Sequence, residues 1–440
     1  MRLKFLMDFL YIMVALMVFV FPLSADGFFF GAGTAAGQGS ISDTRAFTFL
    51  HHGGFNGFRD EVYWSQVEKA PGNFALPSHL RSLDAMIFGA GDRMIKPLVI
   101  LNYGNPIYGG GLPQSSEAVA AFCRYAQFVA GRYKGKVKYY EIWNEWNSGM
   151  GSWPKEPGSA EAYDRLVRAC VPKIKQVDPD VKVLIGSTAG YDRRWTEELL
   201  QKGTMAVADG FSVHPYVFEH HADRTPEKAV SFLMSLSSQI SIHKKPVEII
   251  VSEIGWPTST DAYGIPEDLQ ASYMSRFLLY AKAIPGVKGI SVHCLVDAGD
   301  NPANREHRFG LVRRDLSPKP SLAAINSIAD VLKHGSAVEM SSPESDIRYL
   351  KFVMPNSEEV VALWSNSPTP VTIGTKTSGV KKDVLAQQSS VLSENMSHRV
   401  EVGPAPLLIR GKLGAISVSL SGIEAIGSPP MPPKIVSVKE

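Results

Sequence analysis

The sequence predicts an α/β fold, a (β/α)8 TIM barrel followed by a small C-terminal antiparallel β-sandwich. Eight short apolar runs predict the barrel strands: Phe28–Gly33, Gly57–Asp60, Ile95–Leu101, Val137–Trp143, Val181–Gly186, Gly210–His214, Val247–Ser252 and Gly289–Leu295. Amphipathic stretches with helical spacing separate several of them: Glu117–Tyr133, Tyr163–Val177 and Gln270–Ala283. Strands that alternate with helices pair in parallel through right-handed crossovers. Eight such units over roughly 300 residues fit a closed barrel.

The pattern changes after Lys333, where helical spacing stops. Short strand-like runs follow, separated by Ser, Asn, Pro and Gly: Ile347–Met354, Val360–Ser365, Pro370–Lys376 and Leu407–Arg410. Such runs are typical of an antiparallel sandwich. We therefore expect three parts: an N-terminal targeting segment at 1–26, a catalytic barrel at 27–335, and a sandwich with a Pro-rich tail at 336–440.

The N-terminus has the layout of an export signal. Arg2 and Lys4 precede an apolar run that ends at Leu23, and Ser24 and Ala25 follow. Leu23 is a poor residue for signal-peptidase recognition, so cleavage after Ala25 and retention of residues 5–23 as an inner-membrane anchor both stay open. Either way, we expect the barrel to work in the periplasm or outside the cell.

Composition excludes several functional classes. The 440 residues carry 45 Lys+Arg against 43 Asp+Glu, a net charge of +2, which is not the charge of a nucleic-acid-binding protein. The three cysteines, Cys123, Cys170 and Cys294, are expected to be buried free thiols because their spacing matches no zinc or disulfide pattern. His214 lies near Glu219, His220 and His221, but no further ligand follows at useful spacing, so we expect no metal and no cofactor.

Two glutamates carry the predicted chemistry. Glu145 ends the fourth predicted strand and Glu253 ends the seventh, each among Trp residues and amides. Catalytic groups of a (β/α)8 barrel lie at the C-terminal strand ends, so we expect Glu145 and Glu253 to point into one cleft across the barrel mouth. Two facing carboxylates among aromatic residues and amides are what glycoside hydrolysis requires.

These motifs resemble the clan A retaining glycoside hydrolases. Asn144-Glu145 and Glu253 match the clan pattern of an acid/base after strand four and a nucleophile after strand seven. Finer matches are similar to family 39 and to PslG-type exopolysaccharide endoglycosidases: Arg59 to Glu68, Asn102 to Pro106, His214-Pro215-Tyr216, Asn304 to Leu311, and Ser317 to Pro320. The resemblance covers about residues 28–330. It departs from the family at the end of strand eight, where members usually place a Trp beneath the sugar and this chain has none between Ser291 and Asp297.

The resemblance implies a role for each site residue. Glu253 would be the nucleophile, Glu145 the acid/base, and Asn144 the partner of the sugar 2-hydroxyl. Arg59 and Tyr216 would hold Glu253 ionised and oriented. Aromatic faces and amides suit sugar binding, which predicts further substrate contacts: His214, Trp256, Asn102, Asn105, Tyr108 and Trp153.

The expected function is a retaining glycosidase that cuts within an extracellular bacterial polysaccharide. An exo-acting β-xylosidase-like enzyme, a transglycosylase and a non-catalytic glycan-binding barrel are the alternatives. A product assay separates endo-acting hydrolysis, exo-acting hydrolysis and transglycosylation. The presence of both Glu145 and Glu253 argues against a non-catalytic barrel. The sequence makes no prediction about the oligomeric state, the sugar or the linkage.

Overall fold

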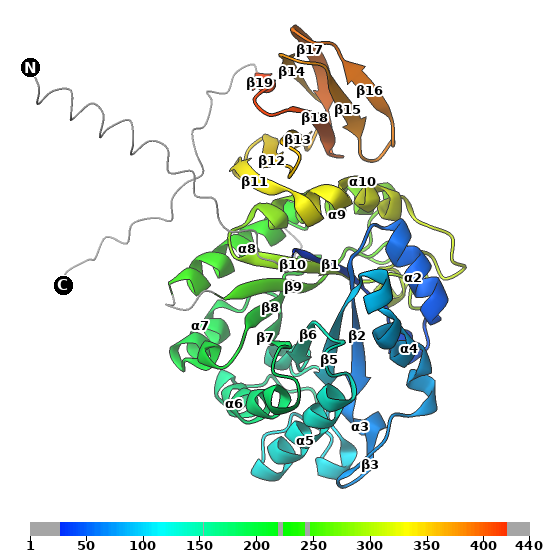
Figure 1. Cartoon of the computed structure of the whole chain (residues 1–440), viewed down its shortest axis with the longest axis vertical. Coiled ribbons are helices and arrows are strands. Elements are labelled where there is room, and N and C mark those ends of the chain that lie inside the picture. The colour runs from blue at the N-terminus through cyan, green and yellow to red at the C-terminus, as the bar shows by residue number, and fades with distance from the viewer. Residues whose placement is uncertain (1–26, 153, 219–222, 243–246, 420–440) are drawn as a thin grey trace, which may run out of the picture.

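The computed structural model describes residues 27–152, 154–218, 223–242 and 247–419, and its first part is a closed barrel of eight parallel strands (Figure 1). The strands are β1 (Phe29–Gly33), β2 (Gly57–Tyr63), β5 (Lys96–Asn102), β6 (Tyr139–Ile142), β7 (Lys182–Ala189), β8 (Gly210–His214), β9 (Glu248–Ile254) and β10 (Val287–Val292). They run around the barrel in chain order, and β10 closes it against β1. The predicted (β/α)8 fold is confirmed.

Helices surround the barrel and bury its outer surface (Figure 1). They are α2 (Asp43–His52), α3 (Trp64–Val67), α4 (Arg81–Gly89), α5 (Ser116–Arg132), α6 (Ala160–Val177), α7 (Arg193–Gln201), α8 (Pro226–Ser241), α9 (Glu267–Ala283) and α10 (Pro320–His334). A short hairpin, β3 (Glu68–Ala70) and β4 (Asn73–Phe74), follows α3. Outward residues of the strands join the helices in one core, whereas inward residues such as Phe29, Ile100 and Ile250 fill the barrel. Alternating side chains explain this division.

The C-terminal part consists of two antiparallel sheets. The larger sheet has the order β11-β12-β13-β18-β15-β16, and the smaller one has the order β17-β14-β19. Their bounds are β11 (Ser336–Met340), β12 (Ile347–Val353), β13 (Glu358–Ser365), β14 (Thr369–Thr375), β15 (Gly379–Asp383), β16 (Ser389–Leu392), β17 (Met396–Val402), β18 (Leu407–Lys412) and β19 (Ile416–Ser419). The sandwich was predicted, but β11, β15, β16, β17 and β19 were not, because their residues are largely exposed and give weak apolar patterns.

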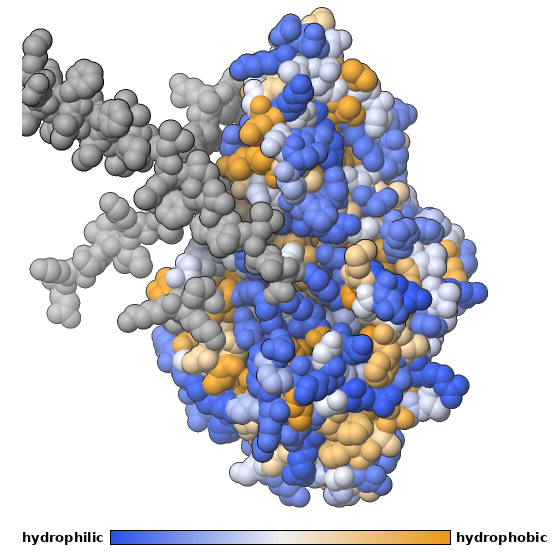
Figure 2. Space-filling view, viewed as in Figure 1, coloured by the Kyte–Doolittle hydropathy of each residue, from blue (hydrophilic) through white to orange (hydrophobic). Residues whose placement is uncertain are grey.

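The central strand β13 of the larger sheet is buried on both faces. In β13, Val361 and Leu363 point into the sandwich, whereas Val360 and Trp364 join the core of the barrel helices. The Trp364 indole donates to Glu227 Oε1 of α8 at 3.0 Å, and Arg276 of α9 forms a buried ion pair with Glu227. The sandwich therefore stands on α9 and α10 (Figure 1) through a continuous core. On the face in Figure 2, apolar side chains are scattered among polar ones.

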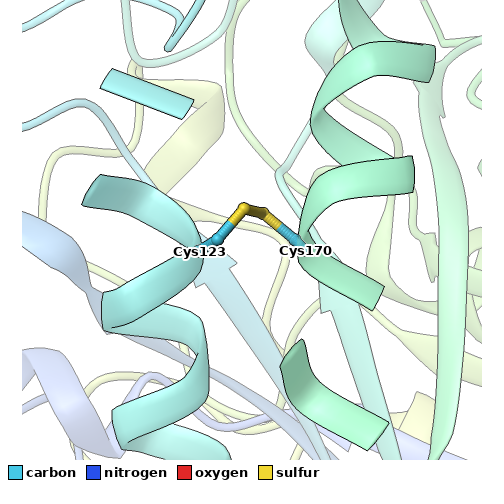
Figure 3. Close-up of a disulfide and its surroundings, with 2 residues drawn as sticks. All are labelled: Cys123 and Cys170. Atoms are coloured by element: carbon cyan, nitrogen blue, oxygen red, sulfur yellow. A yellow bond between two sulfur atoms is a disulfide. The ribbon is translucent and has the colours of Figure 1, made fainter. Parts of the chain in front are cut away.

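The expectation of three free thiols is wrong. Cys123 of α5 and Cys170 of α6 form a disulfide across the two adjacent helices (Figure 3), and only Cys294 among the three is free. The half-cystines are 47 residues apart, and no local motif marks them as a pair. Their meeting depends on how α5 packs against α6, which is a tertiary feature.

The N-terminal prediction stays a prediction, because residues 1–26 lie outside the described residues. Within the described ranges, no helix combines the length and apolar character needed to span a bilayer.

Candidate active site

A cavity of about 600 Å³ opens at the C-terminal ends of the barrel strands. Every strand or the loop after it contributes to the wall, which is the usual construction of an active site in this fold. The ionisable side chains around it are Arg59, Asp60, Glu61, Tyr103, Glu145, Lys155, Tyr216, Glu253, His293, Cys294, Arg305 and Glu306. Glu145 and Glu253, predicted as the catalytic pair, thus face one cavity.

A local irregularity of β9 turns Glu253 into the cavity. Between the pairs Val251–Ile290 and Ile254–Val292, β9 has one residue more than β10. Such bulges re-aim side chains near active sites. Glu253 consequently points into the barrel mouth with 16 % of its side chain exposed.

Four groups surround the Glu253 carboxylate. Arg59 Nη1 lies 2.5 Å from Oε2, and the Tyr216 hydroxyl donates to Oε1 at 2.8 Å. Burial alone would raise the pKa of Glu253, but the His293 and His214 rings, the Arg59 guanidinium and the Tyr216 hydroxyl hold that pKa well below its usual range. Glu253 is therefore ionised at neutral pH, as a nucleophile must be.

Glu145 is held by its own backbone and by one histidine. Its φ of 52° is left-handed, a conformation that costs a non-Gly residue about 1–3 kcal/mol and is found at functional sites. Its N–H donates to Ser187 O at 2.8 Å, where β7 carries an extra residue relative to β8. Its Oε1 lies 3.1 Å from His214 Nδ1, and 14 % of the side chain is exposed.

Both nitrogens of the fully buried His214 ring have polar neighbours. Nε2 lies 3.1 Å from Ser252 Oγ and 3.3 Å from Arg59 Nη2. Nδ1 lies 3.1 Å from Glu145 Oε1, so the contact with His214 involves only one of the two oxygens of Glu145. His214 was predicted to contact substrate, but it is fully buried, is absent from the cavity wall and contacts Glu145 instead.

Arg59 connects the catalytic residues beneath the cavity. Its Nε donates to the buried Glu141 Oε2 at 2.9 Å, and its Nη2 donates to Asn144 Oδ1 at 2.8 Å. Asn144 Nδ2 donates to the Tyr103 hydroxyl at 2.9 Å. One amide hydrogen of Asn144 therefore stays available to a substrate oxygen in the cavity.

Three predicted sugar-binding residues have other partners. Asn102 is buried, and its Nδ2 donates to Glu61 Oε2 at 2.7 Å, so it orients a cavity residue without lining the cavity itself. Asn105 donates to Glu68 O at 2.8 Å, and the Tyr108 hydroxyl donates to Glu68 Oε1 at 2.8 Å. Neither lines the cavity, so their contact with a sugar stays a prediction.

Trp256, one of the two tryptophans predicted to bind sugar, does not line the cavity. Trp256 is fully buried, and its Nε1 donates to Arg224 O at 2.9 Å while its ring packs on Tyr273 and Phe277. Its assignment as a substrate contact is therefore corrected. Trp153 lies outside the described residues.

The sequence interpretation missed several residues of the site. Glu141 could have been found, because strand alternation places it on the same inward face as Tyr139. Glu61 lines the cavity, and burial raises its pKa to about 7. Tyr103 and His293 also line the cavity, but they follow their strands, where alternation gives no direction.

No group of three or more potential metal ligands occurs among the described residues. Glu219, His220 and His221 lie outside those residues.

Comparisons with known proteins agree with this architecture. No family model matches the chain, and a search of curated proteins found no match. A family 39 glycoside hydrolase from Bacteroides cellulosilyticus WH2 is 22 % identical, with a TM-score of 0.73 over 86 % of this chain and 80 % of that one. A monomeric β-xylosidase from Caulobacter crescentus CB15 is 15 % identical, with a TM-score of 0.62 over 88 % and 97 %. A GH30 endoxylanase from Clostridium papyrosolvens C71 is 13 % identical, with a TM-score of 0.62 over 88 % and 96 %. The chain therefore has the fold of family 39 glycoside hydrolases and their clan A relatives, which confirms at the level of the fold the resemblance expected from the sequence.

Proposed function

We propose that the chain is a retaining glycoside hydrolase with Glu253 as nucleophile and Glu145 as acid/base. One observation carries this proposal: both carboxylates face the same cavity and approach the same atom. Glu145 Oε1 lies 3.1 Å and Glu253 Oε2 lies 3.9 Å from His214 Nδ1. A second glutamate with its own hydrogen-bond partners has no purpose in a barrel that only binds glycan.

In the first step, Glu253 attacks the anomeric carbon while the bond to the leaving oxygen breaks. Glu145 delivers its proton to that oxygen, so that the leaving sugar departs as a neutral alcohol. Arg59 and Tyr216 orient the attacking carboxylate through the contacts described above. Asn144 donates to the 2-hydroxyl, a bond that strengthens as positive charge develops on the sugar ring.

In the second step, water attacks the anomeric carbon of the glycosyl ester. Glu145, now ionised, accepts the proton of the water, and Glu253 departs as a carboxylate. His214 keeps Glu145 in place during both steps, because its Nδ1 contacts Oε1 and leaves Oε2 to transfer the proton. Two displacements at one carbon retain the configuration. Retention implies carboxyl carbons about 5–5.5 Å apart.

We propose further that the enzyme cuts within a polysaccharide chain. The cavity wall extends from Met150 and Lys155 after β6 to Arg305 and Glu306 after β10, on the opposite side of the barrel mouth. A site that crosses the mouth suits a chain that continues in both directions. Exo action is the second candidate, because one neighbour is named a β-xylosidase while another is named an endoxylanase.

The test compares wild type with Glu253→Gln and Glu145→Ala. Wild type is incubated with bacterial exopolysaccharides and with aryl glycosides, and products are sized by chromatography. We expect Glu253→Gln to be inactive and folded, and Glu145→Ala to recover activity on an activated aryl glycoside when azide is added. Full activity of Glu253→Gln, or no azide rescue, overturns the assignment. Large early fragments indicate endo action, and monosaccharide release indicates exo action.

We propose that residues 1–26 export the barrel, with or without cleavage. The Cys123–Cys170 disulfide supports this proposal, because disulfides persist in oxidising compartments. Deletion of residues 1–26 should retain the protein in the cytoplasm and leave its activity unchanged. Secretion of the truncated chain would contradict the proposal, and an N-terminus at Asp26 in the native protein would exclude the anchor.

A further inference from the structure

His293 lies where the chain departs from the family pattern, directly after β10. Its side chain is 29 % exposed and lines the cavity. Phe309 contacts the ring edge-on at a centroid distance of 5.1 Å, and the peptide N–H donates to Ile254 O at 2.8 Å. Its Nδ1 lies 3.6 Å from Glu253 Oε1, and neither ring nitrogen makes a hydrogen bond to another described residue. The imidazole is therefore fixed in place, with Nδ1 facing Glu253 and Nε2 left for a ligand.

The two oxygens of Glu253 divide the cavity into two sides. Oε2 faces Arg59, which in turn binds Asn144. Oε1 faces Tyr216 and His293. In a pyranoside, carbon 2 and the ring oxygen flank the anomeric carbon on opposite sides. If Asn144 holds the 2-hydroxyl, the ring oxygen and the substituent of carbon 5 lie on the side of His293.

We propose that His293 forms the floor of the cleavage subsite and selects hexopyranosides, whose carbon 5 carries a polar hydroxymethyl group, over pentopyranosides, which lack it. This inference rests on the proposed function, because it uses the roles of Glu253 and Asn144. It makes His293 the specificity-determining residue of the site.

Size and polarity both favour this selection. An imidazole occupies less space than the indole that family members usually place at this strand end, so it leaves room for a larger substituent. Its Nε2 can donate to or accept from a hydroxyl group. A site that hydrogen-bonds a substrate hydroxyl discriminates against the analogue that lacks this hydroxyl.

The experiment measures kcat/KM on nitrophenyl β-glucoside, β-galactoside and β-mannoside against nitrophenyl β-xyloside. Wild type should prefer its best hexoside to the xyloside by about tenfold or more. His293→Trp should lower this preference at least tenfold by filling the space, and His293→Phe should lower it by removing the nitrogens. His293→Gln, which keeps a hydrogen-bonding group, should retain most of it. His79→Gln, at an exposed histidine outside the cavity, is the control.

A binding measurement separates this inference from the proposed function. Calorimetry compares 1-deoxynojirimycin, which carries the hydroxymethyl group, with 1,5-dideoxy-1,5-iminoxylitol, which lacks it. Wild type should bind the first at least tenfold more tightly, and His293→Trp should reverse the order. Selective binding without any turnover would refute the glycosidase and leave the role of His293 intact. Equal preference in wild type and His293→Trp, or no binding of either compound by wild type, would overturn the role of His293.

Discussion

Removal of the Cys123–Cys170 disulfide should destabilise the barrel without changing its chemistry. The bond joins α5 to α6 and closes a loop between residues 47 positions apart. In the chain-entropy treatment, freeing a loop of this length costs about 4 kcal/mol of the free energy of unfolding. For a domain of this size, such a loss lowers the thermal midpoint by roughly 5–10 °C. Neither cysteine lines the cavity, so kcat/KM should stay unchanged at 25 °C.

The assay follows unfolding by circular dichroism in urea and on heating, with and without dithiothreitol. Cys123→Ser should lose nearly the whole increment, because one substitution already opens the loop. Adding Cys170→Ser to that variant should then have a much smaller effect. Cys294→Ala is the control for stability alone, because this buried thiol lies outside the disulfide but lines the cavity.

Equal unfolding midpoints for oxidised and reduced wild type would refute this reasoning. Alkylation and mass measurement of the unfolded protein must accompany the result, because they show whether the bond was formed. A protein with three alkylated cysteines before reduction would contradict the disulfide itself.

Three further outcomes follow from contacts in the structure. Burial raises the pKa of Glu61 to about 7, so ionisation of this carboxyl costs the native state stability as the pH rises from 4.5 to 7. Glu61→Gln should therefore stabilise the protein by up to about 3 kcal/mol at pH 8 and leave its stability unchanged at pH 4.5. Urea unfolding at both pH values measures the difference. Trp364→Phe should cost about 1.5–3 kcal/mol by removing the hydrogen bond to the charged Glu227, and unchanged urea unfolding would refute the importance of that bond at the sandwich contact. Asn144→Ala should lower kcat roughly 10²–10³-fold on a substrate with a 2-hydroxyl and far less on its 2-deoxy analogue. Equal losses on both substrates would exclude the hydrogen bond between Asn144 and the 2-hydroxyl.

The fold was predictable because its signals are local. Each barrel strand is a short apolar run, and each expected helix has a buried face with helical spacing, so their order alone indicates a parallel barrel. The ends of the strands were less predictable. The extra residue that turns Glu253 into the cavity appears in the pairing of β9 with β10 and leaves no mark in the pattern of hydrophobic residues.

The candidate site was predictable only where chemistry and position coincide. Glu145 and Glu253 stand out because each carboxylate lies at the C-terminal end of an apolar run, where the catalytic groups of a barrel are expected. Trp256 carries the same kind of signal, yet its indole is buried, because a tryptophan suits a core and a sugar platform equally well. His293 could not be assigned from the sequence, because its proposed role depends on the 3.6 Å distance between its Nδ1 and Glu253 Oε1, and Glu253 belongs to another strand.

The central claim is that Glu253 attacks the sugar and forms a covalent intermediate. The most direct test is incubation with activated 2-deoxy-2-fluoro glycosides, whose intermediates hydrolyse slowly, followed by mass spectrometry of the intact protein and its peptides. We expect a mass increase of one glycosyl unit, located on Glu253 and absent in Glu253→Gln. Attachment to any other residue, or turnover of these compounds with inversion and no adduct, would contradict it.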